Sequence, residues 1–169
     1  YRMVIRATAR TSLALFLSAF LASSLLALWP DNVTRWLRRN RRYLGLSFAM
    51  SHAIHLAAII TFARTDPTTF ATLSNKGSII TGSIGYVFIG LLAATSFDRM
   101  VAWLGPKLWQ RIHIIGTWTI CIFFFFTNGK RIPGSNWYLL PVAILFAAVI
   151  VKLAARRKKA KGTNTVSIA

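Results

Sequence analysis

The sequence contains no glutamate, and its acidic residues are limited to Asp31, Asp66 and Asp98. It therefore lacks the paired carboxylates that many hydrolytic sites use, and it has no glycine-rich loop that could cradle a phosphate. A single cysteine, Cys121, excludes a disulfide framework and a cysteine-ligated zinc or iron–sulfur centre within this chain. Because Cys121 lies in an apolar run, we expect it to pack as a small hydrophobic residue.

Charge is scarce and has one sign. Charged residues make up 14% of the 169 residues and hydrophobic residues 55%, whereas soluble domains carry about 25% charged residues. The 21 lysines and arginines give a net charge of +18. Such a charge often indicates nucleic-acid binding. Here the basic residues form short clusters between long apolar runs, so we expect anionic lipid of the cytoplasmic leaflet as their partner and no nucleic acid.

Five apolar runs are long enough to cross a bilayer, which takes about 20 helical residues. They predict an all-α polytopic transmembrane helix bundle over residues 1–155. The basic tail 156–169 is expected to be disordered. In the third run Gly82, Gly85 and Gly90 are small residues of the kind that lets membrane helices approach closely. The runs cover residues 11–29, 43–63, 78–97, 108–127 and 137–155.

The distribution of lysine and arginine predicts the orientation in the membrane. Fourteen of them lie in segments 30–42, 98–111 and 152–161, and seven lie in the segments on the opposite side. We therefore expect segments 30–42 and 98–107 and the C-terminal tail to face the cytoplasm. Residue 1 then faces outward, unless the sequence lacks an upstream helix.

Three histidines, His52, His55 and His113, lie inside apolar runs. Ionisable residues are costly there and are functional candidates by default. His52 and His55 share one helix face because they are three residues apart, while His113 belongs to another helix. Imidazoles from separate helices can clamp a haem iron from both faces. The same histidines could instead hydrogen-bond to neighbouring helices and hold the bundle together, and their placement leaves both interpretations open.

Depth in the membrane distinguishes the possible ligand pairs. With a rise of about 1.5 Å per residue, His52 lies ~14 Å and His55 ~18 Å beyond Tyr43, and His113 lies ~8 Å beyond Leu108. Because two axial ligands must meet at one depth, this comparison favours His52 with His113.

A basic cluster at the start of the second run is a candidate contact for haem propionates or lipid phosphates, of which lipid is the better-supported partner. The aromatic stretch 123–126 is more typical of a packing or lipid-facing surface than of an electron path. The members of the basic cluster are Arg38, Arg39, Arg41 and Arg42.

Several of these residues resemble a known family, the ferric-reductase-like transmembrane domain. Residues 41–46 read Arg-Arg-Tyr-Leu-Gly-Leu and are followed by His55 deeper in the same run. The likeness is closest to the haem-binding membrane subunits of bacterial periplasmic methionine sulfoxide reductase systems (MsrQ, also called YedZ). It continues at Arg10-Thr11, Thr95-Ser96, Leu104-Gly105, Trp109, Ile112-His113 and the turn 133–138.

The resemblance implies a bundle with one helix more than this chain shows, the family's first. It implies b-type haem held by histidines in a bacterial inner membrane. Electrons would pass from a cytoplasmic flavin or a membrane quinol toward the outer face and a partner protein. The chain departs from the family where a second histidine should follow His113 along the same helix, since it has Phe126-Thr127 there. We therefore expect one haem or none: His55 lacks its expected partner, and His52 is an additional candidate.

Two hypotheses follow. The first is a haem b-binding membrane electron-transfer protein, at most the electron-transfer subunit of an oxidoreductase. The alternative is a haem-free structural or accessory subunit of a larger membrane complex, which the missing histidine favours. A small transporter has weaker support, because the charged residues avoid the midplane where a transporter needs a polar cavity.

Overall fold

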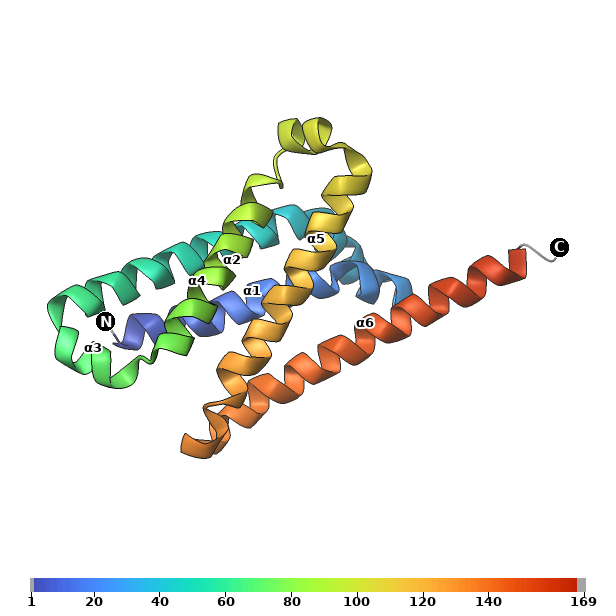
Figure 1. The fold of residues 1–169 in the computed structure, drawn as a ribbon. Helices are drawn as coiled ribbons and strands as arrows, with labels where there is room; N and C mark the ends of the chain where they lie inside the picture. Colours follow the sequence, from blue (N-terminus) through green and yellow to red (C-terminus); the bar gives the residue numbers. More distant parts are fainter. Residues whose placement is uncertain (1, 167–169) are drawn as a thin grey trace. The chain divides into compact units, whose positions relative to one another are not determined.

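The computed structural model of the chain describes residues 2–166, and the side chains of residues 3–161. Within that range all regular elements are helical (Figure 1). Helices α1, α2, α4, α5 and α6 are long, α3 is short, and two single-turn 3-10 helices precede α6. The elements are α1 (Arg2–Leu28), α2 (Asn32–Thr65), α3 (Pro67–Leu73), α4 (Lys76–Ala94), α5 (Asp98–Gly129), η1 (Ile132–Gly134), η2 (Asn136–Tyr138) and α6 (Leu139–Val166).

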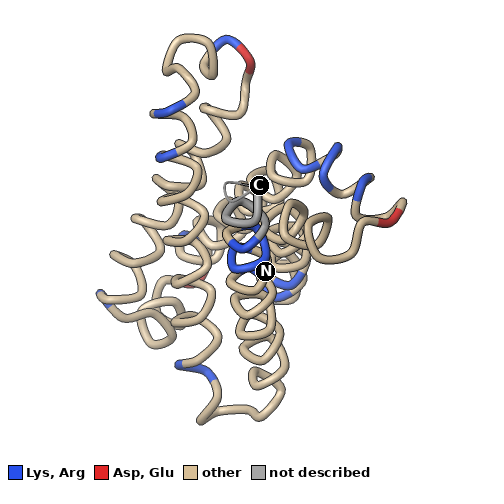
Figure 2. The backbone as a smooth tube through the Cα atoms, turned by 90° about the vertical axis from the view of Figure 1, so that its right-hand side faces the viewer, with Lys and Arg blue, Asp and Glu red and all other residues tan. Residues whose placement is uncertain are grey.

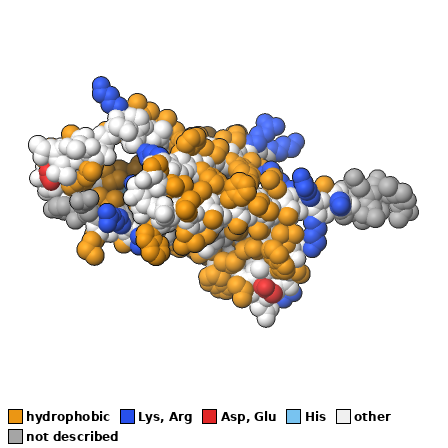
Figure 3. All heavy atoms as spheres, turned by 90° about the horizontal axis from the view of Figure 1, so that it is seen from below, with side chains coloured by type: hydrophobic (Ala, Val, Ile, Leu, Met, Phe, Trp, Pro, Cys, Tyr) orange, Lys and Arg blue, Asp and Glu red, His pale blue; other side chains and the backbone are white. Residues whose placement is uncertain are grey.

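Five of the described helices are long and apolar enough to cross a membrane. Each contains most or all of one predicted run, so the prediction of an all-α polytopic bundle with five spanning helices is confirmed. Hydrophobic side chains cover much of the face shown in Figure 3. Lysine and arginine are concentrated near helix ends and connections, and long helical stretches carry no charge (Figure 2). Extensive exposed apolar surface is unfavourable in water but suits lipid contact, which indicates an integral membrane protein.

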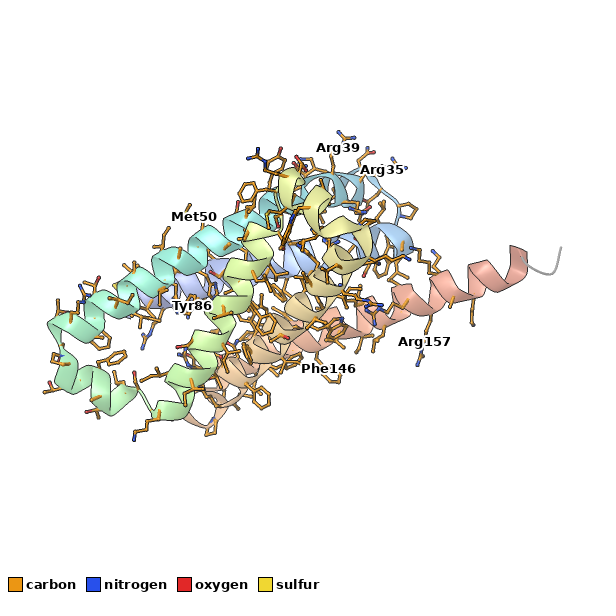
Figure 4. All side chains as sticks on the ribbon, turned by 45° about the horizontal axis from the view of Figure 1, so that its top comes forward. Arg35, Arg39, Met50, Tyr86, Phe146 and Arg157 are labelled. Carbon is orange, nitrogen blue, oxygen red and sulfur yellow. The ribbon has the colours of Figure 1, made fainter. Side chains whose placement is uncertain are left out.

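Helix α2 begins earlier than the second apolar run. Asp31 and Thr34 cap it reciprocally: the Thr34 N–H donates to Asp31 Oδ1 at 2.7 Å, and the Asp31 N–H donates to Thr34 Oγ1 at 3.0 Å. The hydrogen bond from the Thr34 backbone holds the pKa of Asp31 below its ordinary value. The capped helix has 34 residues and is ~51 Å long, longer than the ~30 Å apolar layer. Its arginine-bearing first turns, with Arg35 and Arg39 labelled in Figure 4, therefore extend beyond that layer.

A second cap explains a helix that the sequence pattern did not predict. The pair Asp66-Pro67 is typical of a turn, and in the structure α3 begins there. Asp66 Oδ1 accepts hydrogen bonds from the Thr69 N–H and the Thr68 hydroxyl, each at 3.1 Å, and Pro67 occupies the first turn. Hydrogen bonding from Thr69, through its side chain and its backbone, lowers the pKa of Asp66.

The glycine–proline pair Gly105-Pro106 interrupts α5. Gly105 has φ 73° and ψ 159° inside α5, a region of backbone space that is essentially restricted to glycine. Pro106 follows at the start of the second helical segment, where its missing N–H is tolerated. The break makes 98–104 a separate short arm and leaves the segment after Pro106 to enter the membrane.

Helix α6 continues to Val166, into the segment 156–169 for which we expected disorder. Alanine, lysine and arginine dominate residues 154–161 and are good helix formers. Two lysines also tie this helix to α1: Lys152 Nζ donates to the Phe20 carbonyl and Lys158 Nζ to the Ala27 carbonyl, both at 2.9 Å. Residues 167–169 lie outside the described residues.

Contacts divide the chain into two compact units. The first comprises Tyr1–Leu15 and Gly45–Phe123, and the second comprises Phe16–Leu44 and Phe124–Ala169. All three histidines belong to the first unit. Its buried residues include Cys121, which is 1% exposed, as expected for a packing role. In the second unit the rings of Phe16 and Phe124 lie 5.3 Å apart.

The predicted close approach at α4 glycines is found at one of three positions. A Cβ added to Gly85 would lie 3.2 Å from Phe123, whereas Gly82 and Gly90 have nothing within 4 Å among the described residues. The tightest approach is instead at Gly116 of α5, where an added Cβ would lie 2.9 Å from Leu92 Cδ2. Helix α5 therefore supplies the small residue at this contact, and α4 supplies the large one.

Replacing Gly116 by alanine is expected to destabilise the protein. The new methyl would crowd Leu92, and overpacking of this kind costs about 1–3 kcal/mol. Gly82→Ala is the matched control, because it brings the same gain in helix propensity without a neighbour. Thermal unfolding in detergent should give a lower Tm for Gly116→Ala, partly restored by adding Leu92→Ala. Equal Tm values for Gly116→Ala and Gly82→Ala would contradict this packing.

Candidate functional site

His55 is held by a threonine from another helix. Its Nδ1 lies 2.9 Å from Thr8 Oγ1 of α1. The Thr8 hydroxyl also lies 2.7 Å from the Val4 carbonyl, to which it donates. A hydroxyl has one proton, so Thr8 Oγ1 accepts from the Nδ1–H of His55. The tautomer assigned from this network makes Nε2 the unprotonated nitrogen of His55, the form of nitrogen that can bind a metal.

The seam between α1 and α2 around this pair is polar. Ser12 Oγ donates to Ser51 Oγ at 2.8 Å, and Ser51 Oγ donates to the Thr8 carbonyl at 3.4 Å. Ser12 is fully buried. Thr8 and Ser12 are four residues apart on α1, and Ser51 and His55 are four apart on α2, so each pair lies on one helix face. The two short polar faces meet and fix the register of α1 against α2.

His52 is placed by aromatic packing. Its ring centroid lies 4.8 Å from that of Phe48, 5.6 Å from that of His55 and 5.8 Å from that of Tyr86. Tyr86 belongs to α4 and is labelled in Figure 4. The expectation that His52 and His55 share a face is confirmed by this ring contact. Two residues one turn apart cannot approach an iron from opposite sides of a porphyrin, so this pair alone cannot clamp a haem.

His113 has a different environment, within α5 beside the C-terminal end of α4. Its Nε2 lies 3.1 Å from Thr95 Oγ1, and that hydroxyl donates to the Leu91 carbonyl at 2.7 Å. By the same proton count, the Nε2–H of His113 donates to Thr95. The Trp109 and His113 rings pack at a tilt of 34° with centroids 4.4 Å apart, and Trp109 Nε1–H donates to the Thr95 carbonyl at 2.8 Å. Thr95, which is 2% exposed, therefore joins both rings to the end of α4.

The arginine candidates lie in the first turns of α2, in the second unit. Their position beyond the apolar layer suits contact with lipid phosphates. Among the described residues, no group of three or more His, Cys, Asp or Glu side chains could hold a metal ion. A haem needs axial ligands only, so histidine pairs are the relevant test. Arg38, Arg39 and Arg42 are exposed, and Arg41 is half-buried.

The histidines differ in how well they fit an axial ligand. His55 fits directly, because its Nδ1–H is donated to a hydroxyl and its Nε2 carries no proton, the arrangement that orients metal-bound histidines. His113 would fit through Nε2 in its other tautomer, with the ring proton moved from Nε2 to Nδ1 and the hydrogen bond to Thr95 given up. The Thr95 hydrogen bond contributes about 1 kcal/mol, less than a coordinate bond to iron supplies.

Sequence reasoning missed Thr8, Ser12 and Ser51. Their signal was present as polar residues spaced four apart within apolar runs, Thr8 with Ser12 and Ser51 with His55. Thr95 and Trp109 entered only through the family resemblance, without a role. The structure gives them one, as the partners of His113.

Residues 8–124 match a family described as ferric reductase like transmembrane component. The matched stretch is more than half of the chain and contains all three histidines, together with Thr8 and Thr95. It indicates a function in membrane electron transfer. No curated protein and no solved structure matches the chain.

Proposed function

Because the chain belongs to the ferric-reductase-like transmembrane family, we propose that it binds one haem b and carries electrons across the bilayer. The family match over residues 8–124 carries this proposal. The geometry at His55 supports it, since this histidine already presents Nε2 with its other nitrogen hydrogen-bonded. We also propose that the chain is similar to MsrQ subunits, on the basis of residues 41–46 and the other resembling positions named above.

The proposed axial ligands are His55 of α2 and His113 of α5. They come from different helices, as bis-histidine ligation requires. His52 is the alternative partner that depth favours, and its ring contact with His55 makes it a neighbour of the site in either case. Haem b supplies the one-electron redox chemistry when bound. The chain's own part is to hold the imidazoles, to exclude water with apolar helices and to keep the site within a low-dielectric layer.

The proposed orientation places segments 30–42 and 98–107 and the C-terminal tail in the cytoplasm, in a bacterial inner membrane. The bias of lysine and arginine toward these segments supports it. The electron donor would then be a cytoplasmic flavin or a membrane quinol, and the acceptor a redox protein or partner subunit on the outer side.

A reduced-minus-oxidised absorption spectrum of the purified protein tests the proposal. Protein made in haem-supplemented cells and purified in mild detergent should show a Soret band and, after dithionite, the α and β bands of a b-type haem. Pyridine haemochrome analysis should give haem and chain in equimolar amounts. Protein that is folded by circular dichroism yet takes up no haem, either in cells or from added haemin, would overturn the proposal.

One observation favours the second candidate function, a haem-free accessory subunit. The position where the resemblance requires another histidine is occupied by Phe126 and Thr127, and both are exposed on α5. The same spectrum separates the two candidates. A haem-free protein that copurifies with an untagged membrane partner in stoichiometric amount would support the accessory role.

A further inference from the structure

We propose that Thr8 is a positioning residue that selects the metal-binding nitrogen of His55. Its hydroxyl holds the proton of this imidazole on Nδ1 and directs Nε2 away from α1. The consequence for a bound metal rests on the proposed function, whereas the tautomer itself does not.

The proton count at Thr8 carries the proposal. Thr8 Oγ1 has three close neighbours: the Val4 carbonyl at 2.7 Å, the Ile5 carbonyl at 3.2 Å and His55 Nδ1 at 2.9 Å. Both carbonyls are acceptors only, so the hydroxyl proton points toward its own helix. The oxygen lone pairs are then left for an N–H donor, and the only donor that an imidazole can offer there is Nδ1–H.

The position of Thr8 is itself fixed. Its carbonyl receives the Ser51 hydroxyl at 3.4 Å, and Ser51 in turn receives the Ser12 hydroxyl at 2.8 Å. Ser51 lies one turn before His55, so one face of α2 is attached to one face of α1 at two successive points. The threonine oxygen therefore meets the imidazole in a defined place.

His113 provides the internal comparison. Its threonine partner, Thr95, takes Nε2, the opposite ring nitrogen. The two threonine hydroxyls thus accept from different ring nitrogens: Thr8 from Nδ1 of His55, and Thr95 from Nε2 of His113. A general tendency of buried histidines to find any hydroxyl would not by itself select the nitrogen.

The chemical consequence concerns the electron density on the imidazole. Donation of Nδ1–H to an acceptor makes the ligating nitrogen more basic, which favours the oxidised over the reduced form of a bound iron. Loss of the Thr8 hydroxyl should therefore raise the reduction potential. Outer-shell substitutions change metal affinity about 10-fold or more, and a 10-fold loss of preference for the oxidised form corresponds to about 59 mV in a one-electron couple.

The experiment uses three variants of the full chain. Thr8→Val removes the hydroxyl at nearly constant volume, and Thr8→Ser keeps it. Thr11→Val is the matched control, since Thr11 lies on the same helix and its hydroxyl bonds only the Ala7 carbonyl, at 3.1 Å, among the contacts described. The first readout is nitrogen-15 NMR of labelled histidine in haem-free protein, assigned with His55→Gln, because iron bound to Nε2 would by itself keep the proton on Nδ1. The second is the midpoint potential by spectroelectrochemistry.

In the haem-free protein we expect wild type, Thr8→Ser and Thr11→Val to show the Nδ1–H tautomer of His55, and Thr8→Val to lose it. In the haem-bound protein we expect Thr8→Val alone to raise the midpoint potential. If His55 of the haem-free wild type carries its proton on Nε2, the inference is overturned. This measurement needs no variant, so it tests the inference even if Thr8→Val folds poorly. An unchanged tautomer and potential in folded Thr8→Val would overturn it as well. Absence of haem from the wild type would refute the proposed function alone, because the tautomer is still measured.

Discussion

Replacing His55 by alanine is expected to remove the haem from the purified protein. The Soret band per chain should fall at least about tenfold, because the proposed axial imidazole, whose Nε2 carries no proton, would be gone. Absorption spectra and pyridine haemochrome analysis measure the effect. His55→Ala also leaves the Thr8 hydroxyl without its donor, but this hydroxyl keeps its bond to the Val4 carbonyl, so the fold should persist.

His52→Ala is the matched control for this prediction. It removes an imidazole of the same size from the same helix face, whose ring lies 5.6 Å from that of His55. We expect His52→Ala to retain most of the haem, with a shifted potential because a neighbouring polar ring is lost. The reverse result, haem lost in His52→Ala and kept in His55→Ala, would assign the ligand to His52, as depth alone favours.

Replacing His113 by alanine is expected to convert a six-coordinate low-spin haem into a five-coordinate high-spin one. The reason is that His113 would be the second axial ligand, supplied from α5. Low-temperature electron paramagnetic resonance of the oxidised protein distinguishes the two spin states directly. Haem content should fall less than in His55→Ala, since one ligand remains.

Thr95→Val distinguishes ligation by His113 from a purely structural role. This substitution removes the hydroxyl that receives the Nε2–H of His113 at 3.1 Å and leaves the imidazole in place. If His113 binds iron, Thr95→Val should keep the low-spin spectrum, because that nitrogen is freed rather than lost. If Thr95→Val and His113→Ala both keep the wild-type spectrum and lower Tm by similar amounts, His113 serves only to join α4 to α5.

Much of the fold could be predicted from particular runs of residues. The uncharged apolar stretch 78–97 is long enough to predict a membrane helix, and α4 occupies most of it. The boundaries were less predictable, because caps depend on side-chain geometry. The Asp31–Thr34 box starts α2 well before the apolar run. The Asp66 cap starts α3 in the connection between the second and third apolar runs. Contacts between helices were also hard to predict: of the three glycines of α4 considered, only Gly85 has a close neighbour among the described residues.

The candidate site could also be predicted only in part. The histidines were evident as ionisable groups in apolar runs, and their membership of two helices followed from spacing. Their partners were not evident, because a threonine in an apolar run most often bonds its own helix, as Thr11 does with the Ala7 carbonyl.

The sequence by itself determined that this is a membrane protein of five spanning helices with its charge in the connections, because run length and composition decide which segments can leave water. The tertiary structure alone decided which nitrogen each histidine presents. Thr8 is 47 residues from His55 along the chain, and Thr95 is 18 from His113. A proton's place on an imidazole is set by the acceptor beside it, and only the packing of α1 on α2, and of α4 on α5, brings those acceptors there.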